Sequence, residues 1–441
     1  MDDPQTSSGI TAPSRALDLI LLTSLALILA GLLDITWFRL YFAHPGNDQS
    51  WLLYAAGRML HGTPLYGSQL NETNPPLIIW VSSIPMAAAG WLHIKALTSL
   101  RIFVTVLVVL STLWCLRILR AADLARGLVL CSLWTLALLA LEVSQHGNDF
   151  GQKEHFLILF LLPLLFFESV SPHVRLLLRE RVALGIGAGL SICLKPQDSL
   201  ILVCFELFFV LYTRNIRRLL RPEISAAVLT GLVYVLSVKL FASVYLSQIV
   251  PQLRDTYWAF GEQSTFEVLR GCPIFNVLAI STLLAWILLR RHLRYPAAPA
   301  ALLAGAAGGA LAYAIQNKGW PYQFFPQEAL LACAIAWLAF DALVPLVQAS
   351  PRLLLTRALL PFAVVIAMIT VPTVYRIGYN HDRAVLMTPD SQFLDSTLAA
   401  YPRGTPVTIL AINVMGFNDI LNGELTLATR YHHLWMLPAI V

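Results

Sequence analysis

Residues 44–76 read HPGNDQSWLLYAAGRMLHGTPLYGSQLNETNPP and form a long polar segment between extended apolar runs. The segment contains a carboxylate at Asp48, an arginine ten residues later at Arg58, a Gly/Pro-rich turn and the tripeptide Asn-Pro-Pro at 74–76. Most of the remaining chain is apolar enough for lipid. Chemistry that needs charged side chains is therefore confined to a few polar places, and this one is the longest before the C-terminal tail.

The composition indicates a membrane protein. The 441 residues are 57% hydrophobic and 12% charged, and the mean hydropathy is +0.69. Soluble domains carry about 25% charged residues, and repeated apolar runs of about 20 residues match the thickness of a bilayer. A soluble protein with an unusually large core is the weaker alternative. The net charge of +5 comes from arginines in short loops, which argues against nucleic acid as a partner.

The apolar runs predict an all-α polytopic fold with about 11 transmembrane helices. We expect spans at 16–40, 97–119, 127–145, 154–170, 182–195, 198–213, 224–246, 272–291, 297–316, 327–347 and 355–376. A further run, 76–93, is predicted to be juxtamembrane, because its crossing would place the basic loop 117–126 outside the cell. The predicted parts are a cytoplasmic tail at 1–15, a transmembrane domain at 16–376 and a C-terminal segment at 377–441.

This topology places most polar residues on one face. With the N-terminus inside, the outward pieces are the first loop at 41–96 and the segments 146–153, 195–198, 247–271 and 316–326, whereas the inner loops are short and basic. The tail contains a helix-like stretch (SQFLDSTLAAY) and a strand-like stretch (PVTILAIN). Because about 65 residues are near the lower limit for an independent core, we expect a small extracytoplasmic α/β segment that packs on the membrane domain.

Asp48 precedes a predicted amphipathic helix at 51–61. Aspartate is a good N-cap, and capping alone accounts for its presence. Its place just past the first span also allows a partly desolvated carboxylate to act as a general base. Asp34 is a competitor, because it lies near the outer end of the first span, where an acid is costly unless it has a role.

Residues 146–155, HGNDFGQKEH, place two acids, two histidines and a lysine directly before an apolar run. Glu154 at the start of a helix suits the helix dipole without any further role. The functional alternative is that Asp149 or Glu154 is a second acid, paired with Asp48, that binds a sugar hydroxyl or a divalent metal. The spacing matches no standard metal motif, so no metal ligand is assigned. No cofactor is certain, and a divalent metal stays an open alternative.

Two further polar turns carry cations. Lys195 before Pro196 can snorkel to the interface or hold a lipid phosphate. Lys318 lies beside two aromatic residues in the segment 316–323 (QNKGWPYQ); interfacial aromatics are common in membrane proteins, and sugar rings also stack on them. The candidate substrate-binding residues on the outer face are Arg58, Asn74, Lys153, His155, Lys195, Lys318 and Tyr322.

The order of these motifs resembles the GT-C superfamily of integral-membrane glycosyltransferases, in the branch of protein mannosyltransferases and lipid A aminoarabinose transferases. The resemblance covers about residues 16–330 and rests on Asp48-Gln49, the helix Ala55-Ala56-Gly57-Arg58-Met59, Asn74-Pro75-Pro76, the segment 151–155 (GQKEH), Lys195-Pro196 and Trp320-Pro321-Tyr322. Two positions depart from the family pattern: Gln49 replaces a second acid, and Asn74 replaces a lysine.

The resemblance implies an inverting transfer of a sugar from a polyprenyl-phosphate donor to a lipid, glycan or protein acceptor, on the periplasmic face of a bacterial inner membrane. Asp48 would be the base, Asp149 or Glu154 the second acid, and Lys195 with Arg58 the partners of the donor phosphate. A transporter or flippase for lipid-linked sugars is the alternative. Transporters typically show inverted repeats and mid-membrane polar residues, and neither is evident in this sequence. A non-catalytic scaffold is a weaker third reading.

Overall fold

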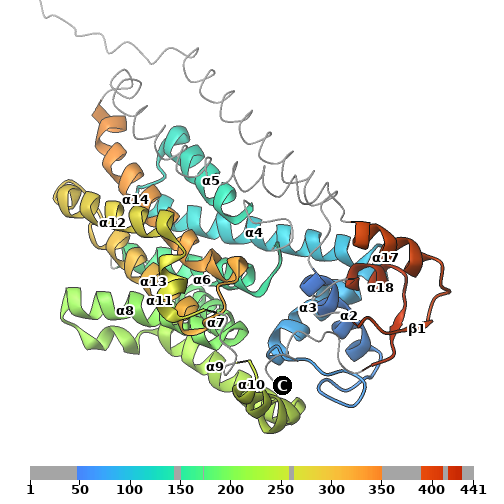
Figure 1. Cartoon of the computed structure of the whole chain (residues 1–441). Helices are drawn as coiled ribbons and strands as arrows, with labels where there is room; N and C mark the ends of the chain where they lie inside the picture. The colour runs from blue at the N-terminus through green and yellow to red at the C-terminus, as the bar shows by residue number, and fades with distance from the viewer. Residues whose placement is uncertain are drawn as a thin grey trace, which may run out of the picture.

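The computed structural model describes residues 47–143, 150–171, 173–257, 263–349, 389–410 and 416–429. In these ranges the chain is a bundle of helices with one two-stranded sheet (Figure 1). The predicted spans at 16–40 and 355–376, and the candidate acids Asp34 and Asp149, lie outside the described residues.

The long helices follow the predicted apolar runs closely. They are α4 (Ala96–Ala121), α5 (Gly127–Val143), α6 (Lys153–Val170), α7 (Leu178–Leu194), α8 (Ser199–Thr213), α9 (Pro222–Phe241), α12 (Pro273–Leu289), α13 (Ala297–Ile315) and α14 (Phe325–Ala349). Within the described residues, five segments are long and apolar enough to cross a membrane: Ala96–Ala121, Pro196–Thr213, Pro222–Phe241, Ala297–Ile315 and Pro321–Ala342. The chain is therefore a multi-pass helical membrane protein.

Short elements connect the long helices. They are the 3-10 turns η1 (Pro196–Asp198), η2 (Ile216–Leu220) and η4 (Pro321–Phe324), the π-turn η3 (Tyr245–Ile249), and the helices α10 (Val250–Asp255) and α11 (Thr265–Arg270). Helix α9 ends earlier than the predicted span at 224–246, because the backbone of Ala242 leaves the helical region and the chain continues into η3.

The described part of the first outer loop contains two helices, α2 (Asn47–Leu60) and α3 (Pro76–Leu92), which pack against each other. Pro76 suits the first position of α3, because its fixed φ fits a helix and its missing N–H is not needed there. Helix α2 begins earlier than predicted, so Asp48 lies inside its first turn and not in front of it. The carboxylate therefore suits the helix dipole, but it is not positioned as the expected N-cap.

The main bundle is held together by aromatic packing and by close helix contacts. Trp134 of α5 packs edge-to-face on Phe340 and Trp337 of α14, with ring centroids 4.8 and 5.6 Å apart. Helices α7 and α9 approach so closely that a Cβ atom at Gly185 would lie 2.1 Å from the carbonyl oxygen of Glu223. Small residues allow such close approaches in membrane helices.

The C-terminal segment contains α17 (Pro389–Ala399), β1 (Pro406–Val407), α18 (Phe417–Asn422) and β2 (Thr426–Leu427), and the two strands pair in parallel. It gathers with α2 and α3 beside one end of α4 (Figure 1). The ring of Phe417 packs 5.5 Å from that of Trp51, and the backbone N–H of Leu427 donates to the Tyr54 hydroxyl at 2.9 Å. The expected α/β segment thus packs on the helix that carries Asp48.

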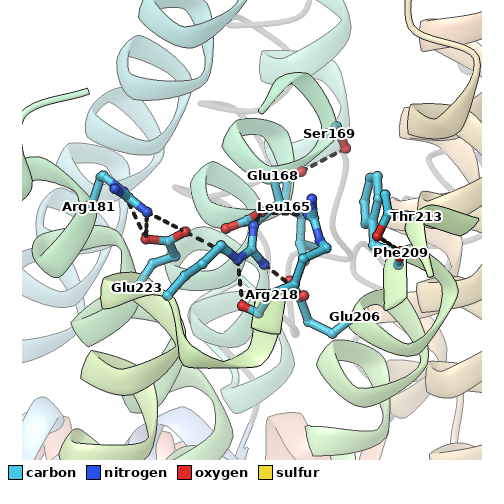
Figure 2. A network of polar contacts seen from close by, with 10 residues as sticks. Leu165, Glu168, Ser169, Arg181, Glu206, Phe209, Thr213, Arg218 and Glu223 are labelled. Carbon is cyan, nitrogen blue, oxygen red and sulfur yellow. Dashed lines mark hydrogen bonds and ion pairs between the residues drawn. The ribbon is translucent and has the colours of Figure 1, made fainter. Parts of the chain in front are cut away.

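The short basic loops that the sequence predicts on the inner side also join helices to one another. Arginines from two of these loops bond to buried glutamates, and together they link α6, α7, α8 and α9 (Figure 2). The six charged residues are Arg181, Arg218, Arg221, Glu168, Glu206 and Glu223. Acids buried in apolar helices are costly unless they are paired, and the loop arginines supply that pairing.

Candidate active site

The start of α6 is tied to the start of α2 by two amide side chains. Gly151, with φ of 87°, turns the chain before α6 in a conformation that favours glycine. The turn brings Gln152 to Asp48, and Gln152 Nε2 donates to Asp48 Oδ2 at 3.2 Å. Gln49 Nε2 donates to the carbonyl oxygen of Phe150 at 2.5 Å. Gln49 therefore joins the two segments.

Lys195 lies at the break between α7 and α8. Pro196 cannot donate a backbone hydrogen bond, so the helix ends there. The buried Lys195 ammonium donates to Glu154 Oε1 at 2.7 Å and lies 3.8 Å from Asp198 Oδ2. The structure thus brings together two predicted site residues, and it adds an aspartate that the sequence indicated only as part of a turn.

One lysine does not satisfy both carboxylates. Glu154 Oε2 and Asp198 Oδ2 are buried and have no hydrogen-bond partner in the part of the chain that the structure describes. Leaving such oxygens unbonded costs about 1–3 kcal/mol each, and most buried polar groups in proteins have a partner. A ligand with O–H groups bound at this position would supply the missing donors.

Lys153 contacts the Asn-Pro-Pro turn. Its ammonium donates to Asn74 Oδ1, and the Asn74 amide group donates to Glu72 Oε1 at 2.8 Å. Glu72 is fully buried and also accepts a hydrogen bond from Trp51 Nε1 of α2. Burial raises the pKa of Glu72, whereas the hydrogen bonds from Asn74 and Trp51 and the charge of Lys153 oppose that rise.

A third group of side chains comes from the turn before α14. The ammonium of Lys318, which is 1% exposed, lies 4.5 Å from the centroid of the Tyr257 ring, in a cation–π contact. Tyr322 lies within electrostatic range of both Asp48 and Glu154. Asp48 of α2, Glu154 of α6 and Tyr322 of η4 therefore lie in the same region of the molecule.

Two further predicted substrate-binding residues are bonded to other groups of the protein. Arg58 donates from Nη2 to Gln69 Oε1 at 3.1 Å in an exposed contact; it lies ten residues beyond Asp48 on α2, which is about 15 Å along the helix axis. His155 is buried, and its Nδ1 accepts a hydrogen bond from the backbone N–H of Gly151 at 3.1 Å. That contact stabilises the turn before α6.

Sequence reasoning missed Glu72. The residue stands in a polar loop two positions before Asn74, where a carboxylate reads as solvated. Its burial comes from Trp51 and from the packing of α2 on α3, which a sequence does not display.

Over the described ranges, no group of three or more His, Cys, Asp or Glu side chains could hold a metal ion.

The fold that positions this site is similar to that of one protein of known structure. The crystal structure of ArnT from Cupriavidus metallidurans bound to undecaprenyl phosphate is similar to this chain with a TM-score of 0.56 and 16% sequence identity, over 92% of this chain and 85% of that chain. At this identity the similarity establishes the fold and not the activity. No family model matches the sequence, and no curated protein matches it.

Proposed function

We propose that this protein is an inverting glycosyltransferase that moves a sugar from a polyprenyl-phosphate donor to an acceptor hydroxyl. One observation carries the proposal: Glu154 and Asp198 share Lys195, and each keeps a buried oxygen without a hydrogen-bond partner among the described residues. Carboxylates with free acceptor positions suit sugar hydroxyls, and the cations around them suit a phosphate. The similarity to a structure bound to undecaprenyl phosphate supports this choice of donor.

The proposed reaction is a single displacement. The acceptor oxygen attacks the anomeric carbon from the face opposite the phosphate, and the bond between that carbon and the phosphate oxygen breaks. The electron pair leaves with the polyprenyl phosphate, and the acceptor proton passes to Asp48 as general base. Gln152 contacts Asp48 Oδ2, so we assign Oδ1 to the proton transfer.

The local charges agree with this direction of proton movement. The carboxylates Glu154 and Asp198 share the Lys195 ammonium, and Lys153 and Lys318 are further buried or partly buried cations of this region. The departing phosphate brings negative charge, which the lysines stabilise. Protonation of Asp48 removes one negative charge at the same time.

We place the reaction on the extracytoplasmic face of a bacterial inner membrane. Helix α6 has Lys153 at its start and Glu168 near its end, about 23 Å apart along the axis. The arginine-rich loops of the Glu168 network therefore lie at the other end of the helix from the site. Basic loops favour the cytoplasm, and this preference supports a site on the opposite side. The acceptor is a lipid, a glycan or a protein.

The test compares membranes that contain equal amounts of folded wild type, Asp48→Asn or Asp123→Asn. Asp123 is a matched control, because it is half exposed and pairs with Arg294 away from the site. Each membrane receives labelled polyprenyl-phosphate sugars and an acceptor extract. We expect transfer by the wild type and the control, and a loss of at least about 100-fold in Asp48→Asn with donor binding retained.

Equal transfer by Asp48→Asn would remove Asp48 from the role of base. If the wild type transfers no sugar but moves labelled lipid between leaflets, the protein is a transporter instead.

A further inference from the structure

Asn74 is held from several sides. The Tyr66 hydroxyl donates to the backbone carbonyl of Asn74 at 2.7 Å. The backbone N–H and the side-chain amide of Asn74 donate to Glu72 Oε1 at 2.6 and 2.8 Å. With the amide nitrogen bonded to Glu72, Asn74 Oδ1 is turned away from that carboxylate and receives the ammonium of Lys153. The orientation of the Asn74 amide is therefore fixed by what its nitrogen contacts.

Glu72 is the centre of this arrangement. It is fully buried, and its second oxygen accepts from Trp51 Nε1 on the same helix as Asp48. A buried carboxylate with several donors is rigid, because each hydrogen bond would be expensive to leave unmade. Glu72 does not contact Lys153 directly, and it influences that cation through Asn74 and through its charge.

We propose that Glu72 is a positioning residue that, through the Asn74 amide, fixes the Lys153 ammonium at the start of α6 for the phosphate of the donor. The identity of the ligand, a donor phosphate, rests on the proposed function. The contacts among Glu72, Asn74 and Lys153 do not depend on it. The alternative is that Glu72 only stabilises the loop between α2 and α3. The two alternatives differ in what happens to Lys153.

The first experiment uses Glu72→Gln in the purified full-length protein. Glutamine keeps the size of the side chain but brings an NH₂ group toward donors that need an acceptor. We expect the KM for the labelled donor to rise about tenfold and kcat to stay within about twofold, because a binding cation and not the base is displaced. The matched control is Glu424→Gln, since Glu424 is exposed and pairs with Arg403 in the C-terminal segment.

The second measurement is independent of sugar transfer. Amine acylation followed by mass spectrometry reports the reactivity of Lys153 relative to the exposed Lys95. We expect the ratio to rise at least about threefold in Glu72→Gln and to stay unchanged in Glu424→Gln, because loss of the Asn74 contact frees the ammonium. A loop-stabilising role alone would lower the yield and thermal stability and leave this ratio unchanged.

Asn74→Ala covers the case in which Glu72→Gln does not fold. It removes the contact to Lys153 and keeps the bonds from Trp51 and from the backbone to Glu72. A folded variant with an unchanged acylation ratio and an unchanged donor KM overturns the proposal. If the wild type shows no transfer at all, the proposed function fails, and the acylation ratio still decides whether Glu72 positions Lys153.

Discussion

The arginine–glutamate network of Figure 2 provides a direct test of how the bundle is held together. Arg221 bonds to Glu168 and, at 2.8 Å, to Glu206, and its Nε lies 3.6 Å from Glu223. The Arg221 side chain is 14% exposed and that of Glu168 is fully buried. Replacing Arg221 by alanine leaves Arg218 as the remaining partner of Glu168 in this network. The positive charge that remains is then smaller than the negative charge of the three buried glutamates.

The magnitude follows from the geometry. At an effective dielectric constant of about 20, two unit charges 2.8 Å apart attract by roughly 6 kcal/mol. Desolvation opposes this attraction, and removing one partner from a buried ion pair costs about 3–5 kcal/mol. Because Arg221 keeps some exposure to solvent, we expect Arg221→Ala to lower the free energy of unfolding by about 3 kcal/mol. Arg403→Ala breaks an exposed pair and should cost less than about 1 kcal/mol.

The assay is equilibrium unfolding in mixed micelles, followed by tryptophan fluorescence, for the wild type, Arg221→Ala, Glu168→Gln and the double variant. The double-mutant cycle should give a coupling free energy of about 1–3 kcal/mol between Arg221 and Glu168, as residues in one ion-pair network do. A coupling near zero, or a loss in Arg221→Ala no larger than that in Arg403→Ala, would refute the view that this network holds α6 to α9 together.

Three further predictions concern the packing and the loop. Gly185→Ala should destabilise the protein by about 1–3 kcal/mol, because its Cβ would overlap a backbone oxygen of α9, whereas Gly231→Ala, which meets nothing within 4 Å, should be neutral or slightly stabilising in the same unfolding assay. Tyr54→Phe removes the hydrogen bond to Leu427, and we expect faster limited proteolysis of the C-terminal segment with little change in the bundle. Burial raises the pKa of Glu72 in the folded protein. The stability that comes from the protonated Glu72 is therefore complete below the ordinary glutamate pKa and is lost as the pH rises through the raised value. The free energy of unfolding measured against pH should lose this pH dependence in Glu72→Gln and keep it in Glu424→Gln.

The helices were predictable because apolar runs leave few alternatives in a membrane. The predicted span 297–316 became Ala297–Ile315, and 198–213 became Ser199–Thr213. The strand-like stretch PVTILAIN was less informative, because only Pro406–Val407 forms a strand in the described part of that stretch. Strand formation depends on a partner, here Thr426–Leu427, which local sequence does not reveal.

The candidate site was predictable only in part. Asp48, Glu154 and Lys195 stand out because charged residues beside apolar runs need a reason. The sequence does not show which residues bond to Glu72 and Glu168. Trp51 meets Glu72 only because the loop packs on α2, and the partners of Glu168 lie far along the chain. Glu168 is 50 residues from Arg218 and 53 from Arg221. A single sequence shows that such an acid is costly, but not which cation offsets the cost.

The two ends of α6 suggest why the protein keeps its charges in two separate places. At one end, arginines and glutamates bond to each other and join four helices. At the other end, Glu154 and Asp198 share the single ammonium of Lys195. Buried oxygens without a hydrogen-bond partner among the described residues occur at both ends, at Glu154 and Asp198 and also at Glu168 and Glu206 of the network. The two ends differ in their cations, because three arginines join the acids of the network to one another, whereas the two acids of the proposed site share one lysine; a site of this kind has to stand on elements that other contacts hold rigid.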